Sequence, residues 1–419
     1  MTGRELRWLE AEAGRVLERN RQSGVGWNGV EYDFVCPSRV TYPFQWFWDS
    51  CFHTIVLSHL DRARARSEVA GLLANQQPDG SIPHVIFWQR EQYEHVIPTY
   101  AIAFRSPFLS DQMQPPLLAE AVAAAAGDDS DYLRSVLPSL VRYYDWCHTV
   151  RDPDDDGLIA VLQADETGLD HSPKFDRYLG IDSTEHADFT RAWHRVADRY
   201  EEVGRDPAAM FALDVFQVED VMVNTIYIEN QRVLADLCHR VGDSSAAENY
   251  RNRADRGFQS LFARCWDEER GLFFDLAGGS ESWLTTNTVT SLFPLLLPDT
   301  PEEVVARLVA HLVDSDEYAA RYPMPSVAMN EPSYAPGVVG GSLVWRGPTW
   351  LNANWYLARG LSRHDRVEMA SRIVDRSVDL VRLSGFREYY NPETGEGNGA
   401  PDFAWSTIVL DMALRELDA

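Results

Sequence analysis

The order and spacing of its helical segments constrain the fold of this 419-residue chain more than any other feature. Apolar residues recur at helical spacing between capping and breaking residues, and strand-like alternation is rare. The predicted helices cover residues 4–22, 49–60, 62–75, 115–126, 131–148, 218–240, 244–262, 287–297, 301–313, 348–360, 365–383 and 402–417. Short links follow the even-numbered helices and long links follow the odd-numbered ones, which predicts helices paired as antiparallel hairpins.

Six such hairpins can close into a ring. We therefore expect an all-α fold, an (α/α)6 toroid whose even-numbered helices form an inner barrel and whose long loops all emerge at one end. A linear solenoid is the competing arrangement, but the chain shows no repeated short consensus. In a ring, the long loops converge over the N-terminal ends of the inner helices, where free backbone N–H groups and helix dipoles favour ligand binding.

The domain organisation expected from this pattern is a single catalytic domain over residues 1–419. Residues 171–217 are longer than a plain connection between two helices requires. We expect this segment to form an insertion that acts as a lid or cap over the ligand site.

Composition limits the partners and the compartment. A formal net charge of -26 argues against nucleic acid and anionic membranes, because phosphate groups would be repelled. The 5 cysteines are scattered, without a C-x-x-C pair, which favours reduced thiols and a cytoplasmic protein. The N-terminus lacks an apolar stretch, and no run approaches about 18 apolar residues, so neither export nor membrane spanning is expected. The sequence leaves the oligomeric state open, a homo-oligomer included.

Aromatic residues crowd the stretch 41–53, where Trp46, Phe47 and Trp48 precede Asp49 and Ser50. The Asp-Ser pair is an N-cap signal for the next helix. Flat apolar faces beside a fixed hydrogen-bond acceptor are what a pyranose ring requires. The alternative is that the tryptophans belong to the core and that Asp49 only caps a helix.

One acidic run, Asp152-Pro153-Asp154-Asp155-Asp156-Gly157, suggests a calcium-binding loop. The twelfth position from Asp152 is Gln163, however, and not the glutamate that such a loop requires. A solvated turn is the preferred interpretation, and no metal site is predicted. G-x-S-x-G, Walker A and H-E-x-x-H motifs are also missing, and no cofactor is expected.

Carboxylates, amides and aromatic side chains dominate the long loops, a combination that fits hydrolysis of a glycosidic bond by two carboxylic acids. One acid must donate a proton to the leaving oxygen, and the other must be ionised to activate water. Asp170 and Glu388 lie in loops of different hairpins, so they can face each other across a sugar. Other carboxylates are rivals, as hydroxyl binders, caps or surface charges: Asp49, Glu166, Glu393 and Glu396.

Five ordered motifs carry a resemblance to a known family. They are Phe47-Trp48-Asp49-Ser50, Gln114-Pro115-Pro116, Gly168-Leu169-Asp170, the run Trp-Arg-Gly-Pro-Thr-Trp at 345–350, and Glu388-Tyr389-Tyr390 with the Phe-Ala-Trp at 403–405. Together they resemble glycoside hydrolase family 63, and within it the short bacterial branch of mannosylglycerate and glucosylglycerate hydrolases. The likeness extends from about Trp46 to Trp405.

The resemblance implies an (α/α)6 toroid that hydrolyses α-glycosides with inversion, with Asp170 as the general acid and Glu388 as the general base. It also implies that Trp48, Asp49 and several partners bind the non-reducing sugar ring. The complete set of predicted substrate-binding residues is Tyr42, Trp46, Trp48, Asp49, Trp88, Gln114, Gly168, Arg191, Arg195, Trp345, Arg346, Trp350 and Trp405.

Substrate choice stays open at this stage. Arg191 and Arg195 are candidates for a clamp on a glycerate carboxylate; the alternative is that they are surface charges paired with Glu185, Asp188 or Glu201. The leading hypothesis is a small α-glycoside, mannosylglycerate or glucosylglycerate. Alternatives are kojibiose, trehalose or an oligosaccharide as substrate, a sugar epimerase that uses histidines, or a sugar-binding protein without catalysis. The histidines available to an epimerase are His53, His84, His171 and His194.

Overall fold

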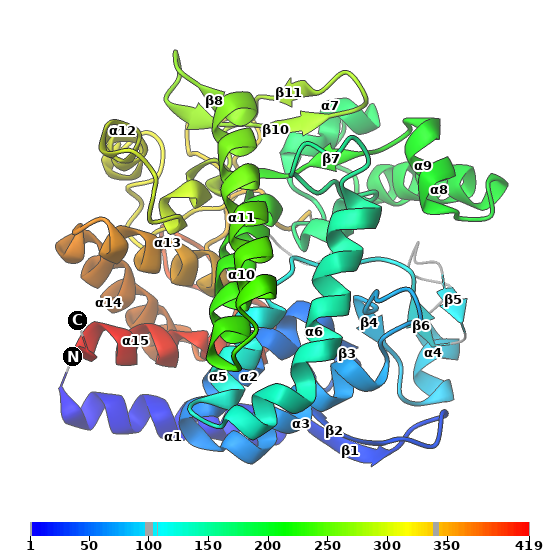
Figure 1. Ribbon diagram of the computed structural model, residues 1–419. Helices are drawn as coiled ribbons and strands as arrows, with labels where there is room; N and C mark the ends of the chain where they lie inside the picture. Colours follow the sequence, from blue (N-terminus) through cyan, green and yellow to red (C-terminus); the bar gives the residue numbers. More distant parts are fainter. Residues whose placement is uncertain (1, 97–103, 107, 338–342, 419) are drawn as a thin grey trace.

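The computed structural model describes residues 2–96, 104–106, 108–337 and 343–418. They form a mostly helical fold (Figure 1). The α-helices are α1 (Gly3–Arg19), α2 (Phe47–Leu60), α3 (Arg62–Ala74), α4 (Arg90–Val96), α5 (Leu118–Ala126), α6 (Ser130–Arg151), α7 (Asp176–Leu179), α8 (His186–Glu202), α9 (Pro207–Leu213), α10 (Val221–Arg240), α11 (Ser244–Cys265), α12 (Glu302–Val313), α13 (Leu351–Arg363), α14 (Val367–Ser384) and α15 (Val409–Asp418). The 3-10 helices are η1 (Ala164–Thr167), η2 (Pro173–Phe175), η3 (Val289–Leu296) and η4 (Ala404–Ile408).

Every predicted helix falls on a helical element, although three of them differ in form. Residues 287–297 contain a 3-10 helix instead of an α-helix, and Pro294 inside it cannot donate a backbone hydrogen bond. Residues 402–417 are divided between η4 and α15. The segment predicted from Pro115 becomes helical only at Leu118.

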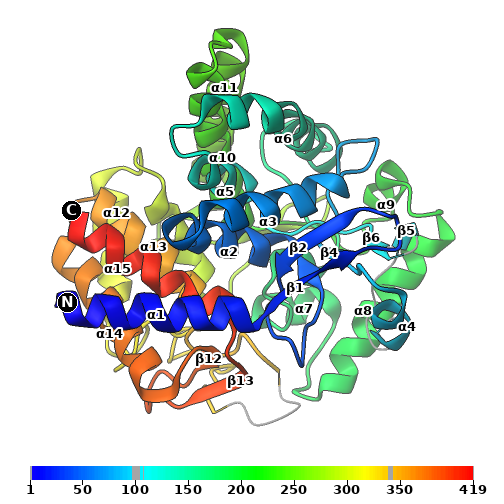
Figure 2. The ribbon, with the colours of Figure 1, turned by 90° about the horizontal axis from the view of Figure 1, so that it is seen from below.

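The helices pack as pairs along the chain: α2 with α3, α5 with α6, α10 with α11, η3 with α12, α13 with α14, and α15 with α1. The first members of the pairs also contact one another in succession. This succession runs from α2 through α5, α10, η3, α13 and η4 and returns to α2. The last pair joins the two ends of the chain, so α1 and α15 lie side by side (Figure 2).

Burial differs between the first and the second members of the pairs. The side chains of α2 are buried without interruption from Phe47 to Leu57, as expected for a helix surrounded by protein. In α1, by contrast, only a stripe of Leu9, Ala13, Val16 and Leu17 is buried.

Local capping explains the short links. Asp61 alone connects α2 to α3, and its side chain accepts hydrogen bonds from the backbone N–H groups of Ala63 and Arg64. Asp129 and Asp243 cap α6 and α11 in the same way. A carboxylate at each helix start satisfies free N–H groups and leaves no room for a longer loop.

The expectation that strands are rare was wrong for the long loops, which contain short strands. These are β1 (Arg21–Val25), β2 (Glu31–Val35), β3 (Gln45–Trp46), β4 (Val85–Ile86), β5 (Phe104–Ser106), β6 (Leu109–Ser110), β7 (Val218–Glu219), β8 (Trp266–Asp267), β9 (Leu272–Phe273), β10 (Asp275–Ala277), β11 (Ser282–Leu284), β12 (Arg387–Tyr390) and β13 (Gly397–Pro401). They form five antiparallel sheets, ordered β1-β2, β3-β4-β6-β5, β11-β10-β7, β8-β9 and β12-β13. Most have only two or three residues, too few for an alternating pattern to be visible in the sequence.

The 171–217 insertion contains three helices that the sequence analysis did not predict, α7, α8 and α9, which lie together at one side of the molecule (Figure 1). Helix α8 is amphipathic, with Phe189, Ala192, Val196 and Tyr200 on its buried face. Near the start of the insertion, the buried Lys174 ammonium contacts the carboxylates of Asp220 at 2.5 Å and Asp275 at 2.9 Å. The insertion is therefore tied to the N-terminal end of α10.

All five cysteines are buried and free. Within the part of the chain that the structure describes, no helix combines the length and apolar character needed to cross a bilayer.

Candidate active site

A cavity of about 320 Å³ lies where the segments preceding several inner helices meet. It brings together eleven of the fifteen predicted site residues: Tyr42, Trp46, Trp48, Asp49, Gln114, Gly168, Asp170, Trp345, Trp350, Glu388 and Trp405. Most of them lie at or just before the N-terminal ends of α2, α5, α13 and η4. The convergence of the long loops over one set of helix ends is thus observed for these segments.

Tryptophan rings form one wall of the cavity. The rings of Trp345 and Trp350 are stacked, with centroids 3.8 Å apart and an interplanar angle of 5°. Trp405 meets Trp350 and Trp48 edge to face, at 5.6 Å and 5.4 Å. The buried Nε1 atoms of Trp350 and Trp405 have no hydrogen-bond partner among the described residues. Flat faces and unused N–H donors together suit a sugar ring and its hydroxyl groups.

Trp345 has a φ of +62°, a left-handed conformation that is unfavourable for a bulky residue. Backbone strain of this kind persists only where surrounding contacts enforce it, and it concentrates at functional sites. Here the stacking on Trp350 holds the ring against the cavity.

Gly168 allows the segment that carries Asp170 to approach Trp48. A Cβ atom at position 168 would lie 2.4 Å from Cζ2 of Trp48, far inside van der Waals contact. The residue also has a φ of +72°. Both its conformation and its contact therefore require glycine.

Glu388 lies on β12, half-buried at the edge of the cavity. The Tyr42 hydroxyl donates a hydrogen bond to its Oε1 at 3.2 Å, and the Ala400 backbone N–H donates to its Oε2 at 2.8 Å. Burial raises the pKa of Glu388 to about 7, although both hydrogen bonds favour the charged form. The negative charge of Asp170 raises it further, so the two carboxyl groups interact across the cavity.

Asp170 follows η1 and is also half-buried. Burial raises the pKa of Asp170 to about 6. Its own backbone N–H opposes this rise, and no side-chain donor contributes. Both carboxyl groups thus titrate near neutral pH, and of the two only Glu388 has a side-chain donor, Tyr42, that stabilises its ionised form.

Asp49 and Gln114 complete the polar part of the cavity. The Gln114 Oε1 accepts a hydrogen bond from the backbone N–H of Trp48 at 3.1 Å, which fixes the start of α2. Asp49 is only 4% exposed, and its Oδ1 has no hydrogen-bond partner among the described residues. Burial, with the charges of Glu388 and Asp170, raises the pKa of Asp49 well above its ordinary value. Helix α2 begins at Phe47, so Asp49 lies in its first turn and is not its cap.

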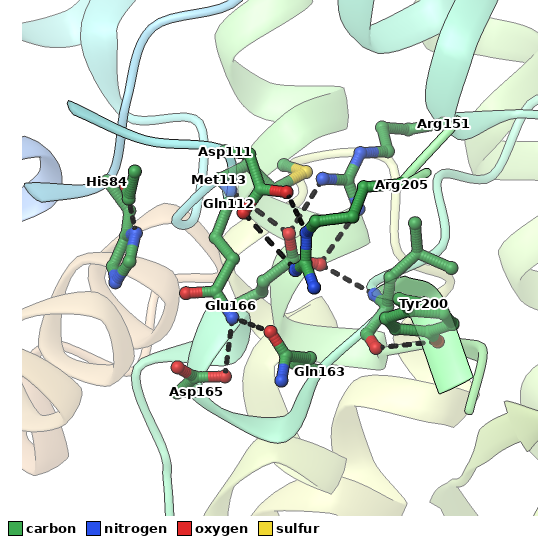
Figure 3. A network of polar contacts seen from close by, with 12 residues as sticks. His84, Asp111, Gln112, Met113, Arg151, Gln163, Asp165, Glu166, Tyr200 and Arg205 are labelled. Atoms are coloured by element: carbon green, nitrogen blue, oxygen red, sulfur yellow. Dashed lines mark hydrogen bonds and ion pairs between the residues drawn. The ribbon is translucent and has the colours of Figure 1, made fainter. Parts of the chain in front are cut away.

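A buried network holds the loops that carry Gln114 and Asp170 (Figure 3). Arg151 makes two contacts with Glu166, at 2.8 Å and 2.7 Å. Glu166 also accepts hydrogen bonds from the backbone N–H groups of Met113 at 3.0 Å and Leu162 at 2.6 Å. One carboxylate therefore joins the segment before Gln114 to the segment before Asp170. Glu166, a rival acid in the sequence analysis, is committed to this ion pair and does not line the cavity.

Known proteins with similar sequences agree with this geometry. Residues 42–406 match the family described as the mannosylglycerate hydrolase MGH1-like glycoside hydrolase domain. A mannosylglycerate hydrolase from Thermus thermophilus is 30% identical, over 95% of this chain and 98% of the relative. The chain belongs to glycoside hydrolase family 63. A glucosylglycerate hydrolase from Mycolicibacterium hassiacum is 26% identical, over 88% of this chain and 92% of the relative.

Solved structures of family 63 enzymes also resemble this glycoside hydrolase. The crystal structure of a family 63 mannosylglycerate hydrolase from Thermus thermophilus in complex with glucose has a TM-score of 0.82 and 29% identity, covering 97% of this chain and 100% of that one. The complex of that crystallised enzyme with Tris and D-glycerate has a TM-score of 0.81 at 27% identity, with the same coverage.

Four predicted site residues of the glycoside hydrolase do not line the cavity. Trp88 is buried in the core, where it stacks on Tyr32 and its indole N–H donates to Gln45 at 2.9 Å. Arg346 is 5% exposed, pairs with Asp176 at 2.5 Å and lies over the ring of Phe189.

The other two are the arginines proposed as a carboxylate clamp. Arg191 pairs with Asp188, and Arg195 donates to the carbonyl oxygen of Leu179 at 3.2 Å. Both are exposed, because Phe189 and Ala192 set the buried face of α8 and the arginines lie off that face. The ion pair with Asp188 agrees with the surface-charge alternative for Arg191.

The sequence analysis missed several residues that line the cavity from the 171–217 insertion. His186, Thr190 and Trp193 follow one another at helical spacing along α8. His171 stacks on Trp193, with ring centroids 5.2 Å apart and an angle of 8°, and burial lowers the pKa of His171 to about 3. The spacing of these residues would have revealed a second functional face, had a helix been predicted here.

Two more polar residues of the cavity, His84 and Asp165, were not predicted as site residues. The buried His84 ring contacts the Ser110 hydroxyl at 2.6 Å, and burial lowers its pKa to about 3. Asp165 also lines the cavity, and burial with the charges of Asp170 and Glu166 raises its pKa to about 8. The cavity also contains Val344.

Proposed function

We propose that the protein hydrolyses the α-glycosidic bond of a small glycoside with inversion, with Asp170 as general acid and Glu388 as general base. The observation that carries this proposal is the cavity itself. It contains both carboxyl groups, each with a pKa raised by burial, beside a wall of tryptophan rings. Asp170 protonates the leaving oxygen, and Glu388 activates a water molecule on the opposite face of the sugar.

The hydrogen bonds support this division of roles; the two pKa values do not, because burial raises the pKa of Glu388 above that of Asp170. A general base must be ionised, and Glu388 accepts hydrogen bonds from Tyr42 and Ala400 that favour its carboxylate form. A general acid must hold its proton, and Asp170 lies in a buried position that favours its neutral form. Asp49, with a buried oxygen that has no partner among the described residues, is suited to accept from a sugar hydroxyl.

Mannosylglycerate or glucosylglycerate is the substrate that the family relatives favour, because relatives with both names align with most of this chain. The cavity volume of about 320 Å³ suits a compound of that size. Trp48 directly precedes Asp49 and packs edge to face on Trp405, so we assign these two rings to the sugar. His186, Thr190 and Trp193 of α8 then face the other part of the substrate.

A second candidate is an α-glucoside with an uncharged aglycone, such as kojibiose or trehalose. The observation that favours it is the composition of the cavity: no arginine or lysine lines it within the part of the chain that the structure describes. A glycerate carboxylate would have to bind through neutral donors there.

The architecture that accompanies this function is an (α/α)6 toroid with the 171–217 insertion as a lid. The paired helices and the returning succession of contacts from α2 to η4 support the ring. The contribution of α8 side chains to the cavity supports the lid.

The test combines two variants with a stereochemical assay. Asp170→Asn and Glu388→Gln should each reduce turnover by about 10³-fold or more, because the first variant loses the proton donor and the second loses the base. Proton NMR of the first product formed should show the β-anomer of the released sugar. Wild-type activity in either variant, or an α-anomer as first product, would overturn the mechanism. A panel of α-mannosides and α-glucosides, with and without a glycerate aglycone, then selects between the two substrate candidates.

A further inference from the structure

One acidic side chain of the cavity has no part in the proposed reaction. Asp165 lines the cavity together with Asp49, Asp170 and Glu388. Asp170 and Glu388 are assigned to the two proton transfers, and Asp49 is suited to accept from a sugar hydroxyl. Asp165 is half-buried, and within the described residues no cation pairs with it. A carboxyl group in such a place costs free energy unless something compensates it.

The backbone turns Asp165 and Glu166 to different sides. Both belong to the 3-10 helix η1, where successive side chains point about 120° apart. Glu166 reaches into the protein and pairs with the buried Arg151, whereas Asp165 lies apart from that ion pair (Figure 3). The Asp165 carbonyl oxygen accepts from the Gly168 N–H at 3.0 Å, which closes the turn that leads to Asp170. Asp165 and the proposed general acid are thus carried by the same turn.

Gln112 holds one oxygen of the Asp165 carboxyl group. Its amide Nε2 donates to Asp165 Oδ1 at 3.4 Å and also to the side-chain oxygen of Gln163 (Figure 3). Both hydrogens of this amide then have an acceptor. Gln114, two residues further along the chain, accepts from the N–H of Trp48, and Trp48 is one of the rings assigned to the sugar. The segment that carries Gln112 therefore links Asp165 to the sugar end of the cavity.

The second oxygen of Asp165 is free for a ligand. Within the described residues, no side chain other than Gln112 donates to this carboxyl group. Burial raises the pKa of Asp165 to about 8, and the charges of Asp170 and Glu166 act in the same direction, so the group keeps its proton at neutral pH. A neutral carboxylic acid can both donate and accept a hydrogen bond, and so can a sugar hydroxyl.

We propose that Asp165 contacts the sugar directly and binds one of its hydroxyl groups, and that it thereby helps to determine which sugar the enzyme accepts. The inference rests on the proposed function, because it requires a glycoside in the cavity. Asp49 and Asp165 then bind different hydroxyl groups, the first from the start of α2 and the second from the turn before Asp170. Two such contacts from separate segments restrict the orientation of the ring more than either does alone.

The test measures how Asp165 variants discriminate between a glycoside and analogues that each lack one hydroxyl group. The parent compound is the nitrophenyl α-D-mannoside or α-D-glucoside that the wild type hydrolyses faster. In the wild type, loss of the hydroxyl that Asp165 binds should lower kcat/KM by at least about tenfold. Asp165→Ala should lower kcat/KM for the parent by a similar factor and hydrolyse that one analogue as fast as the parent. Wild-type ratios between parent and every analogue in this variant would overturn the inference.

A second variant and a control separate contact from structure. Asp165→Asn keeps a neutral donor and acceptor, so its kcat/KM for the parent should stay within about threefold of the wild type; a loss as large as that of Asp165→Ala would contradict the proposal. Gln163 shares the Gln112 amide but does not line the cavity. Gln163→Ala should therefore keep the wild-type discrimination. If it loses discrimination as Asp165→Ala does, a displaced turn explains both variants and the direct contact is refuted.

The ratio of two kcat/KM values does not depend on which carboxyl group is the acid and which is the base. Full activity in Asp170→Asn would overturn the proposed mechanism and leave this test as informative as before. Failure of the wild type to hydrolyse any α-glycoside would overturn both the proposed function and the role of Asp165.

Discussion

The position of a Cβ atom on Gly168 lies 2.4 Å from Cζ2 of Trp48, so the loop that ends in Asp170 touches the aromatic wall of the cavity through bare backbone. We therefore predict that Gly168→Ala lowers the free energy of unfolding by about 1–3 kcal/mol, from backbone strain and the displaced ring. Because Asp170 moves with this loop, kcat/KM should fall by at least about tenfold, a change that corresponds to a modest misplacement of the acid. Chemical denaturation and steady-state kinetics measure the two effects.

Gly180 provides a matched control for that prediction. It has a φ of +66°, close to that of Gly168, but nothing lies within 4 Å of an added Cβ. Gly180→Ala should incur the backbone cost of about 1 kcal/mol alone and keep full activity. Equal losses in the two variants would show that the contact with Trp48 is unimportant.

The pH dependence of activity should be a narrow bell. The active form carries one proton on the pair, and the pKa values of Asp170 and Glu388 are raised to about 6 and about 7. Below the lower value both groups are protonated and no base remains; above the higher value both are ionised and no acid remains. We expect kcat/KM to be maximal between pH 6 and 7 and to fall about tenfold per pH unit outside this range. A plateau that continues to pH 9 would contradict the pairing.

Tyr42→Phe should weaken the base. Loss of a donor to the charged form raises the pKa of Glu388, so fewer molecules carry the ionised base at a given pH. A loss of about 1 kcal/mol predicts a three- to tenfold lower kcat/KM at neutral pH. Tyr132→Phe is the control, since the Tyr132 hydroxyl on α6 has no hydrogen-bond partner among the described residues. Unchanged kinetics in Tyr42→Phe would remove the tyrosine from the mechanism.

Glu166→Gln tests the buried network that joins the two loops. The change keeps the shape of the side chain but leaves the Arg151 charge without its partner in a buried position. The expected loss of unfolding free energy is about 3–5 kcal/mol, with reduced activity because Gln114 and Asp170 lose their common support. The exposed Arg199–Glu202 pair is a control, and Glu202→Gln should cost less than about 1 kcal/mol. Similar stability of the two variants would show that the buried network of Arg151 and Glu166 does not support the fold.

Helical periodicity and capping predicted most of the fold, because each long helix carries its own signals in the sequence. The amphipathic helix α8 escaped notice inside a segment that was treated as one long insertion, and with it Trp193 and Thr190 at the cavity. The orientation of the missed helix also explains why Arg191 and Arg195 lie outside the cavity. A charged residue can be assigned to a site only when the buried face of its helix is known.

The aromatic residues show a similar limit. Trp48 and Trp405 could be assigned to the site because they stand beside helix starts within motifs, whereas Trp88 had only its loop position in favour of a site. Its pairing with Tyr32 and Gln45 depends on contacts between distant parts of the chain.

The packing of α1 against α15 has a consequence for biosynthesis. The pair is assembled from opposite ends of the chain, and η4 is the segment that returns the succession of contacts to α2 (Figure 2). During translation, α1 is made long before α15 and must wait for this partner. Trp405, which belongs to the tryptophan wall of the cavity, lies in η4 and is therefore also made late. We expect the cavity to stay incomplete until the segment with Trp405 and α15 has been made, which leaves the apolar stripe of α1 uncovered for a long interval.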